Sequence, residues 1–167
     1  MSSSGLADKR LLEERKLFRK NRPYGFVAKP ATKGDGSTDM RLWECRIPGP
    51  SGTAWEGGSY PVTLKFGDSY PVEPPACSFP EGFFHPNVYP DGEVCLSLLN
   101  NDADLGGQWA PSISITQILQ GIQELLNNPN IYSPAQKHAY DVLKNSPATY
   151  EKMVREQSKK YPSPDDE

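Results

Sequence analysis

The spacing of apolar residues changes part-way along this chain, and that change limits the folds open to it. From Trp43 to Ile47 and from Tyr60 to Phe66, apolar side chains occupy every second position, the period of a half-buried β-strand. From Ile115 to Leu126 they recur at intervals of three and four, the period of a helix with one buried face. Because the strands are grouped before the helices, the sequence predicts an α+β fold.

Local signals add the other elements of the first half. A helix is expected from about Ser4 to Lys20, with Pro23 closing it and with Ala7, Leu11 and Phe18 on one stripe. The strand patterns that follow are, in order, Phe26-Val27-Ala28, Trp43 to Ile47, Tyr60 to Phe66, and Cys77-Ser78-Phe79. Turns rich in glycine and proline separate them at hairpin-like intervals, so we expect an antiparallel meander of about four strands.

Three helices are expected in the last third of the chain. Ser114 followed by Gln117 fits a capping box at the start of the first. Ser133-Pro134 carries a similar start signal, with serine as the N-cap and proline at the first helical position. Ser146-Pro147 opens the last helix, whose helical spacing extends to Tyr161.

Chain length and charge bound the architecture and the partners. The chain is expected to form one domain over residues 1–167, ordered roughly from residue 5 to residue 161. It has no run of about 18 apolar residues and no signal-peptide pattern, so we expect no membrane association and a reducing compartment. A formal net charge of −3 argues against nucleic acid as the main ligand. Residues 9–22 are nonetheless basic, which indicates either a patch for an acidic protein partner or a solvated helix face.

The chain has three cysteines, and none belongs to a C-x-x-C pair, which argues against a disulfide scaffold and a zinc site. Cys45 and Cys77 occupy inward positions of strand patterns and are expected to be buried. Cys95 lies in residues 79–111, which lack a regular period, and long irregular stretches inside compact domains are often functional. Composition alone leaves open whether its thiol is structural or reactive.

The residues around Cys95 carry the most specific signal. They read His85-Pro86-Asn87, then a glycine turn, then Val94-Cys95-Leu96, with Tyr70-Pro71 and Pro74-Pro75 before them and Trp109-x-Pro111 after them. This joint pattern resembles the active-site signature of the ubiquitin-like-protein conjugating enzymes, and the resemblance covers roughly residues 6–161. The branch of that family that conjugates SUMO is the most similar, through residues 14–16, 19–20, 23–28, 55–58, 85–99 and 118–136.

The resemblance implies the four-helix, four-stranded fold of that family and a transferase mechanism. An activating enzyme would use ATP and pass the C-terminal glycine of SUMO to the Cys95 thiol, and a substrate lysine would then attack the thioester. Asn87 would stabilise the oxyanion of the intermediate or brace the loop that presents it, and Tyr89 would pack the apolar stem of the lysine. The chain itself is expected to need no cofactor and no metal.

Several positions depart from the SUMO branch. Ser133 stands where the branch typically has aspartate, so electrostatic help to the incoming lysine is expected to be weaker. Asp91 stands where the branch usually has serine, and we hypothesise that it supplies some of the missing negative charge. Ala76 and Ser78 replace lysines thought to read the acidic residue that follows a target lysine, so this preference is expected to be weaker or met by other residues. Residues 103–108 form a longer loop than the branch has, without an assigned role.

The resemblance also implies partners. Arg15, Lys16, Arg19 and Arg22 would contact SUMO non-covalently, on the side away from Cys95, and would dock the activating enzyme. SUMO ligases and proteins that carry target lysines are further expected partners, and neither nucleic acid nor membrane is among them. A monomer in the nucleus and cytoplasm is expected.

Three other functions stay open at this point. An enzyme that conjugates ubiquitin itself is the nearest, and modifier choice measured side by side would decide. A non-catalytic modifier-binding module of the same fold would be expected to lack the thiol. A cysteine protease would need a histidine beside Cys95. His85 is instead expected to pin the loop, because Pro86 follows it.

Overall fold

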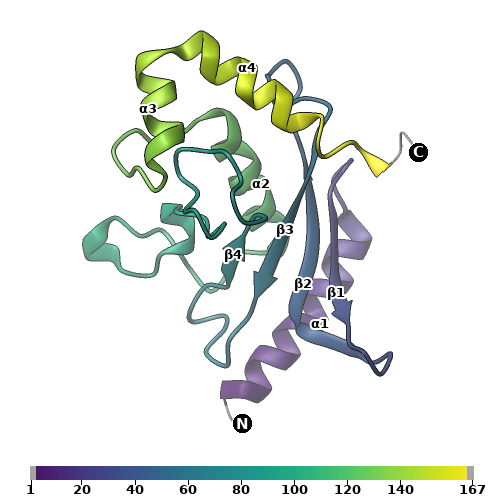
Figure 1. The fold of residues 1–167 in the computed structure, drawn as a ribbon. Helices are drawn as coiled ribbons and strands as arrows, with labels where there is room; N and C mark the ends of the chain where they lie inside the picture. Colours follow the sequence, from purple (N-terminus) through teal and green to yellow (C-terminus); the bar gives the residue numbers. More distant parts are fainter. Residues whose placement is uncertain (1–2, 165–167) are drawn as a thin grey trace.

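The structure is a computed structural model of the chain, and it describes residues 3–164. Residues 1–2 and 165–167, at the ends of the predicted domain, lie outside the described part. One antiparallel sheet has the order β1-β2-β3-β4, with β1 at Val27–Thr32, β2 at Thr38–Pro48, β3 at Ser59–Lys65 and β4 at Ala76–Ser78. The helices are α1 (Ser3–Asn21), α2 (Ile115–Asn127), α3 (Lys137–Asn145) and α4 (Pro147–Ser158), with short 3-10 turns η1 (Ser97–Leu99) and η2 (Ala103–Leu105). The predicted α+β meander followed by three helices is confirmed (Figure 1).

The core lies between the sheet and two helices. The inward residues of β2 pair in register with those of β3, as Cys45 does with Val62 and Ile47 with Tyr60. All four side chains are buried, so the period-two pattern marks the core face as predicted. Helices α1 and α2 both contact β2, and the apolar stripe of α2 is buried against the sheet. Helices α3 and α4 pack on each other beyond one end of the sheet (Figure 1).

A buried carboxylate connects α1 to α2. Glu14 is only 5% exposed, and one oxygen accepts a hydrogen bond from the Ile115 amide at 2.8 Å, at the start of α2. Its other oxygen pairs with the Arg10 guanidinium at 3.1 Å. A carboxylate there is favoured because the first amides of a helix lack intrahelical partners. The predicted capping box is also present, with the Gln117 amide donating to the Ser114 hydroxyl at 3.1 Å.

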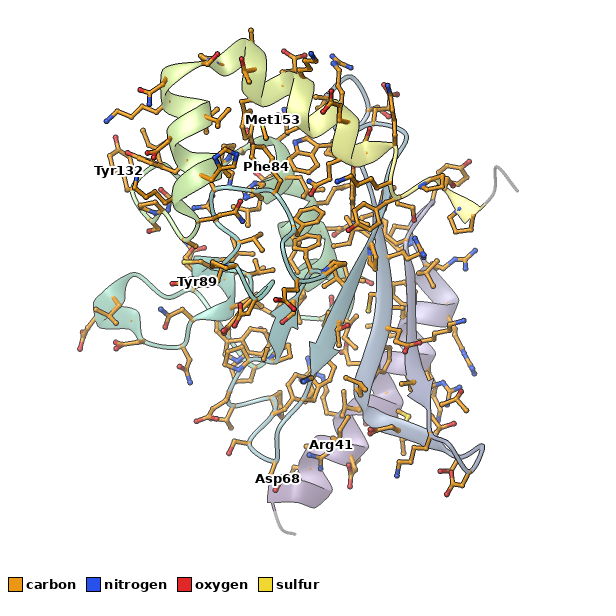
Figure 2. The ribbon with its side chains drawn as sticks, in the orientation of Figure 1. Arg41, Asp68, Phe84, Tyr89, Tyr132 and Met153 are labelled. Carbon is orange, nitrogen blue, oxygen red and sulfur yellow. The ribbon has the colours of Figure 1, made fainter. Side chains whose placement is uncertain are left out.

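Arg41 on β2 binds two acidic groups, one of them on α1. Its guanidinium lies 2.8 Å from the carboxylate of Asp8 and 2.9 Å from that of Asp68. Figure 2 shows Arg41 and Asp68 together at the end of the sheet that lies away from α4. Asp8 and Glu14 therefore attach α1 at two points along its length, to β2 and to the start of α2.

The predicted start of the next helix at Ser133-Pro134 is wrong, because α3 begins at Lys137. The backbone amides of Ala135 and Gln136 donate instead to the Pro86 carbonyl, at 2.8 and 3.3 Å. The extended segment before α3 is therefore bound to the loop that precedes Cys95. The local start signal is overridden by this tertiary contact.

The last helix begins as predicted, with Pro147 in its first turn, but it ends at Ser158. Tyr161 therefore lies beyond it, contrary to the prediction. Its ring packs edge-on against Tyr60, with centroids 5.9 Å apart, and its carbonyl accepts from the Ser59 amide at 2.7 Å. The ring is partly buried against β3, so Tyr161 is spaced like a core residue of the helix although it lies outside it.

Within residues 3–164, no helix combines the length and apolarity that a membrane span needs. No group of three or more histidine, cysteine, aspartate or glutamate side chains in that same range could hold a metal ion.

Candidate active site

The segment that carries Cys95 is fastened to the edge of the sheet. Glu93 pairs with Ser78 of β4, and the Val94 amide donates to the Cys77 carbonyl at 3.0 Å. The Cys95 amide then donates to the Asn87 carbonyl at 2.8 Å. Backbone hydrogen bonds to β4 and to the segment around Asn87 therefore fix the position of Cys95.

The three thiols differ in accessibility. Cys45 and Cys77 are buried as predicted, and burial raises the pKa of the Cys45 thiol to about 12 and the pKa of the Cys77 thiol well above its ordinary value. Cys95 is partly exposed. Since the thiolate is the nucleophile, Cys95 is the one of the three that is suited to covalent chemistry.

The glycine turn before Cys95 is required by its geometry. Gly92 has a φ of 101°, and a Cβ at this position would lie 2.1 Å from the Phe79 carbonyl oxygen. Any side chain would therefore strain the backbone and displace the neighbouring strand. The turn returns the chain to β4 with Cys95 three residues later.

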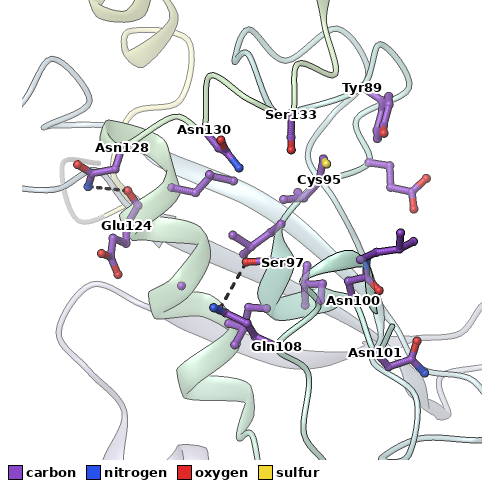
Figure 3. Close-up of a pocket in the computed structure, with 18 residues that line it drawn as sticks. Tyr89, Cys95, Ser97, Asn100, Asn101, Gln108, Glu124, Asn128, Asn130 and Ser133 are labelled. Carbon is purple, nitrogen blue, oxygen red and sulfur yellow. Dashed lines mark hydrogen bonds between the residues drawn. The ribbon is translucent and has the colours of Figure 1, made fainter. Parts of the chain in front are cut away.

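A groove of about 660 Å³ runs from Cys95 along α2 (Figure 3). Leu105 of η2 lies at its edge with 75% of its surface exposed, so the longer loop contributes to this groove. Gly121 lets α2 approach closely, because a Cβ there would lie 2.7 Å from the Leu98 side chain. Its volume lies within the range of ligand-binding clefts, and the Cys95 thiol is part of its lining.

The loop before Cys95 is irregular, but side-chain amides satisfy its backbone. The Gln136 amide donates to the carbonyls of Phe83 and Val88, at 2.8 and 3.1 Å. The Gln157 side chain of α4 bonds to both the amide and the carbonyl of Phe84, at 2.7 and 3.0 Å. Buried backbone groups need such partners when no strand or helix supplies them. The helices thus hold the loop in place.

His85 is fully buried, and both its ring nitrogens are occupied by backbone groups. Nε2 lies 2.9 Å from the Leu125 carbonyl, and Nδ1 accepts a hydrogen bond from the Asn87 amide at 3.0 Å. Burial lowers the pKa of His85 to about 4, so the ring is neutral at ordinary pH. These contacts fit the predicted role of pinning the loop and give the protease hypothesis no base beside Cys95.

Asn87 is also fully buried, and its side chain spans two loops. Its amide nitrogen donates to the carbonyls of Asn130 and Ser133, at 2.8 and 2.9 Å, and its oxygen accepts from the Asn130 amide at 2.8 Å. Both amide hydrogens are therefore in use. This geometry favours the bracing alternative over oxyanion donation, which would require one of these bonds to break.

Tyr89 and Ser133 stand on either side of the thiol. Tyr89 lines the groove with 43% of its surface exposed, and the pKa of its hydroxyl is raised by the charge of Cys95, by a hydrogen bond to the same sulfur, and by the charges of Glu93 and Asp91. The Ser133 hydroxyl is directed toward Cys95 (Figure 3). It is not an N-cap, so it is free of the structural role that the sequence suggested. Asp91 is exposed, and its carboxylate accepts from the Glu93 amide at 2.9 Å.

A family model described as ubiquitin-conjugating enzyme matches residues 10–158. The chain belongs to this family. Its similar relatives include the SUMO-conjugating enzyme SCE1 of Arabidopsis thaliana, with 53% identity over 96% of this chain and 98% of the relative. The Sumo-conjugating enzyme ubc9 of Dictyostelium discoideum is 50% identical over 96% of this chain and 99% of the relative. The SUMO-conjugating enzyme UBC9 of Caenorhabditis elegans is 52% identical over 95% and 93%. The resemblance seen in the sequence is confirmed.

The structure brings three of the predicted site residues into the groove, since Cys95, Tyr89 and Ser133 all line it. Asn87 is buried, with its carbonyl bound to the Cys95 amide, and Asp91 lies on the exposed turn before Glu93. The basic residues Arg15, Lys16, Arg19 and Arg22 belong to α1 and the turn after it, and none of them lines the groove. The basic residues therefore form a surface separate from the groove.

Sequence reasoning missed Glu93 and Gln136. Glu93 lines the groove together with Cys95. The sequence did contain a signal for this, because residues 93 and 95 are two apart, and such residues project to the same side of an extended segment. Gln136 stood in a similarity motif, but nothing local indicates that its amide reaches back to residues 83 and 88. Its role becomes visible only when the two segments are placed together.

Proposed function

We propose that this conjugating enzyme carries SUMO as a thioester on Cys95 and transfers it to substrate lysines as an isopeptide. The observation that carries the proposal is the partly exposed Cys95 thiol in the lining of a groove of about 660 Å³. Relatives with 50–53% identity over nearly the full chain are SUMO-conjugating enzymes, which supports SUMO as the modifier.

In the loading step, the Cys95 thiolate attacks the thioester that joins the C-terminal glycine of SUMO to its activating enzyme. The new carbon–sulfur bond forms as the activating enzyme's thiolate leaves, so no energy source is needed at this step. ATP is used earlier by the activating enzyme, and we expect this chain to bind no cofactor. The tail of SUMO then occupies the groove along α2.

In the transfer step, the amine of a target lysine attacks the thioester carbonyl and the Cys95 thiolate leaves. A lysine with a pKa near 10.4 must lose its proton first, which costs about 4 to 5 kcal/mol at pH 7. A site that removes water from the lysine and orients it lowers this cost. Tyr89 and Ser133 line the same groove as Cys95, which supports contacts from them to the lysine stem and the amine.

Asp91 is proposed to offset part of the positive charge of the incoming lysine. Its negative charge contributes to the raised pKa of the Tyr89 hydroxyl, which supports this role. Asp91→Asn should therefore change the pH dependence of transfer to lysine, measured in single-turnover discharge. An unchanged pH–rate profile would remove this role.

The surface formed by Arg15, Lys16, Arg19 and Arg22 is proposed to bind SUMO non-covalently and to dock the activating enzyme. Lys16, Arg19 and Arg22 are exposed, and Arg15 is partly so. SUMO ligases and lysine-bearing substrates complete the expected partners. We propose a monomer that acts in the nucleus and cytoplasm.

The deciding experiment offers two modifiers side by side. The protein is incubated with ATP, SUMO and its activating enzyme, and in parallel with ubiquitin and the ubiquitin-activating enzyme. Adducts are read by intact mass and by non-reducing gel, with and without dithiothreitol, for the wild type and for Cys95→Ala. A reducible SUMO adduct that requires Cys95 is expected. An adduct with ubiquitin alone would overturn SUMO as the modifier but keep the chemistry. An adduct with neither would leave a binding module of the same fold.

A further inference from the structure

Negative charge lies next to Cys95, where a target lysine must approach. One row of side chains crosses the sheet from β1 to the active-site segment, with Lys29 opposite Glu44, Glu44 opposite Thr63, Thr63 opposite Ser78, and Ser78 opposite Glu93. Glu93 ends this row two residues before Cys95. The row therefore ends on a carboxylate beside the reactive thiol.

Other acidic groups surround Glu93. Asp91 lies on the same turn, where its carboxylate accepts from the Glu93 amide at 2.9 Å and the Glu93 carbonyl accepts from the Tyr89 amide at 2.9 Å. Glu81 is exposed on the next turn, which is joined to this one by a hydrogen bond from the Gly82 amide to the Pro90 carbonyl at 3.0 Å. Asp91 and Glu93 thus place two carboxylates on the turn that carries Tyr89, and Glu81 adds a third on the adjoining turn.

The groove that contains Cys95 is acidic. Among the described residues that line the groove there is no lysine or arginine, and the charged ones are Glu93 and Glu124. Within the sheet, the nearest cation by strand register is Lys65 of β3, which lies opposite Ala76 of β4. It is two strands and two residues away from Glu93, about 12 Å. At that distance salt screens most of its effect.

The donor tail and the acceptor peptide need different approaches to the thiol. Tyr89 lies on the side of Cys95 away from α2 (Figure 3), so a lysine that meets a SUMO tail held along α2 would pass Tyr89 and the turn that carries Asp91 and Glu93. On an extended peptide, the side chain two residues from the lysine emerges on the same side, about 7 Å away. Glu93 is likewise two residues from Cys95 along an extended segment. The two side chains can therefore meet when the lysine amine is at the thioester.

We propose that this active site favours target lysines followed, at the second position, by arginine or lysine in place of an acidic residue. The proposal rests on transfer of SUMO from Cys95 as proposed above. An acidic side chain at that position would face Asp91 and Glu93 and be repelled, with neither Ala76 nor Ser78 able to compensate. A basic side chain would pair with the same carboxylates.

The test measures discharge of preformed SUMO–Cys95 thioester to peptides that differ at one position. Three peptides of equal length carry one lysine, followed at the second position by arginine, glutamine or glutamate. At peptide concentrations below saturation, we expect the arginine peptide to react at least about fivefold faster than the glutamate peptide, with a smaller ratio at high salt. A glutamate peptide that reacts equally fast or faster would overturn the proposal.

Variants assign the effect to the named carboxylates. Asp91→Asn with Glu93→Gln should bring the ratio close to one, whereas Glu44→Gln should keep it, because Glu44 lies three strands away, about 14 Å. Ala76→Lys with Ser78→Lys should reverse the preference, which gives a second measure that removes no native side chain contact to Tyr89. A ratio unchanged in both double variants would refute the assignment. Because only the ratio is read, a general loss of rate does not imitate the result.

The failure of this inference is distinct from the failure of the proposed function. If the wild type forms no reducible SUMO adduct at Cys95, the function itself is wrong. If the adduct forms and discharges to the three peptides at equal rates, the function stands and the basic preference is wrong.

Discussion

The bracing role of Asn87 leads to a prediction about stability that separates it from a role in catalysis. The side chain makes three hydrogen bonds to residues 130 and 133, and it is fully buried. Asn87→Ala would remove all three and would leave the Asn130 amide without its partner. At about 0.5–1.5 kcal/mol for each bond, we expect the free energy of unfolding to fall by about 3 kcal/mol.

The assay is urea unfolding of the wild type, Asn87→Ala and the control Asn101→Ala. Asn101 also lines the groove but is exposed, so its substitution should change the free energy of unfolding by less than about 0.5 kcal/mol. Hydrogen exchange should speed up selectively in residues 128–136 of Asn87→Ala, because that loop loses its attachment.

A different result would refute the bracing argument. If Asn87 served only as an oxyanion donor, Asn87→Ala would slow transfer about 10²- to 10³-fold and leave stability unchanged. An Asn87→Ala variant within about 0.5 kcal/mol of the wild type, with normal exchange in residues 128–136, would therefore assign Asn87 to the chemistry.

Three further predictions follow from the site and from the basic helix. Because the pKa of buried His85 is about 4 and that of an unfolded histidine is near 6.5, the unfolded state gains a proton first as the pH falls, and stability should drop by about 2 kcal/mol between pH 7 and pH 5. Urea titrations at each pH should show a flatter profile for His85→Gln; an identical slope would contradict this. Gly92→Ala should lower the free energy of unfolding by more than about 2 kcal/mol and slow SUMO loading, since the new Cβ meets the Phe79 carbonyl; a stable, fully active variant would disprove the strain. Arg15→Glu with Arg19→Glu should weaken non-covalent SUMO binding strongly, and more so at low salt, in calorimetric titrations; unchanged low-salt affinity would leave this face merely solvated.

The sequence by itself determined the layout and the reactive residue. Period-two alternation in residues 43–47 and 60–66 needs one buried face, and the structure buries the apolar side chains of both segments. The same reasoning predicted that Cys45 and Cys77 are buried, as the structure confirms. It found Cys95 in an irregular stretch, where the surrounding motif identified the family. These features are local, so they can be read from neighbours along the chain.

Two similar start signals show where local reasoning ends. Ser114 caps α2 as predicted, because nothing else binds the first amides of that helix beyond Glu14 and its own capping box. Ser133-Pro134 does not start α3, because the amides of Ala135 and Gln136 donate to the Pro86 carbonyl, 49 and 50 positions earlier in the chain. A serine before a helical pattern specifies a cap only when no tertiary partner competes for the same backbone groups.

Only the tertiary structure decided how the active site is held and charged. Asn87, Gln136 and Gln157 each reach across more than 40 residues to satisfy the backbone of a neighbouring segment. The position of Glu93 beside Tyr89 and opposite Ser78 is set by its pairing with β4. Hydrogen bonds and charges act through space, and the distances between such residues are set by the packing of the whole core, which no local pattern contains.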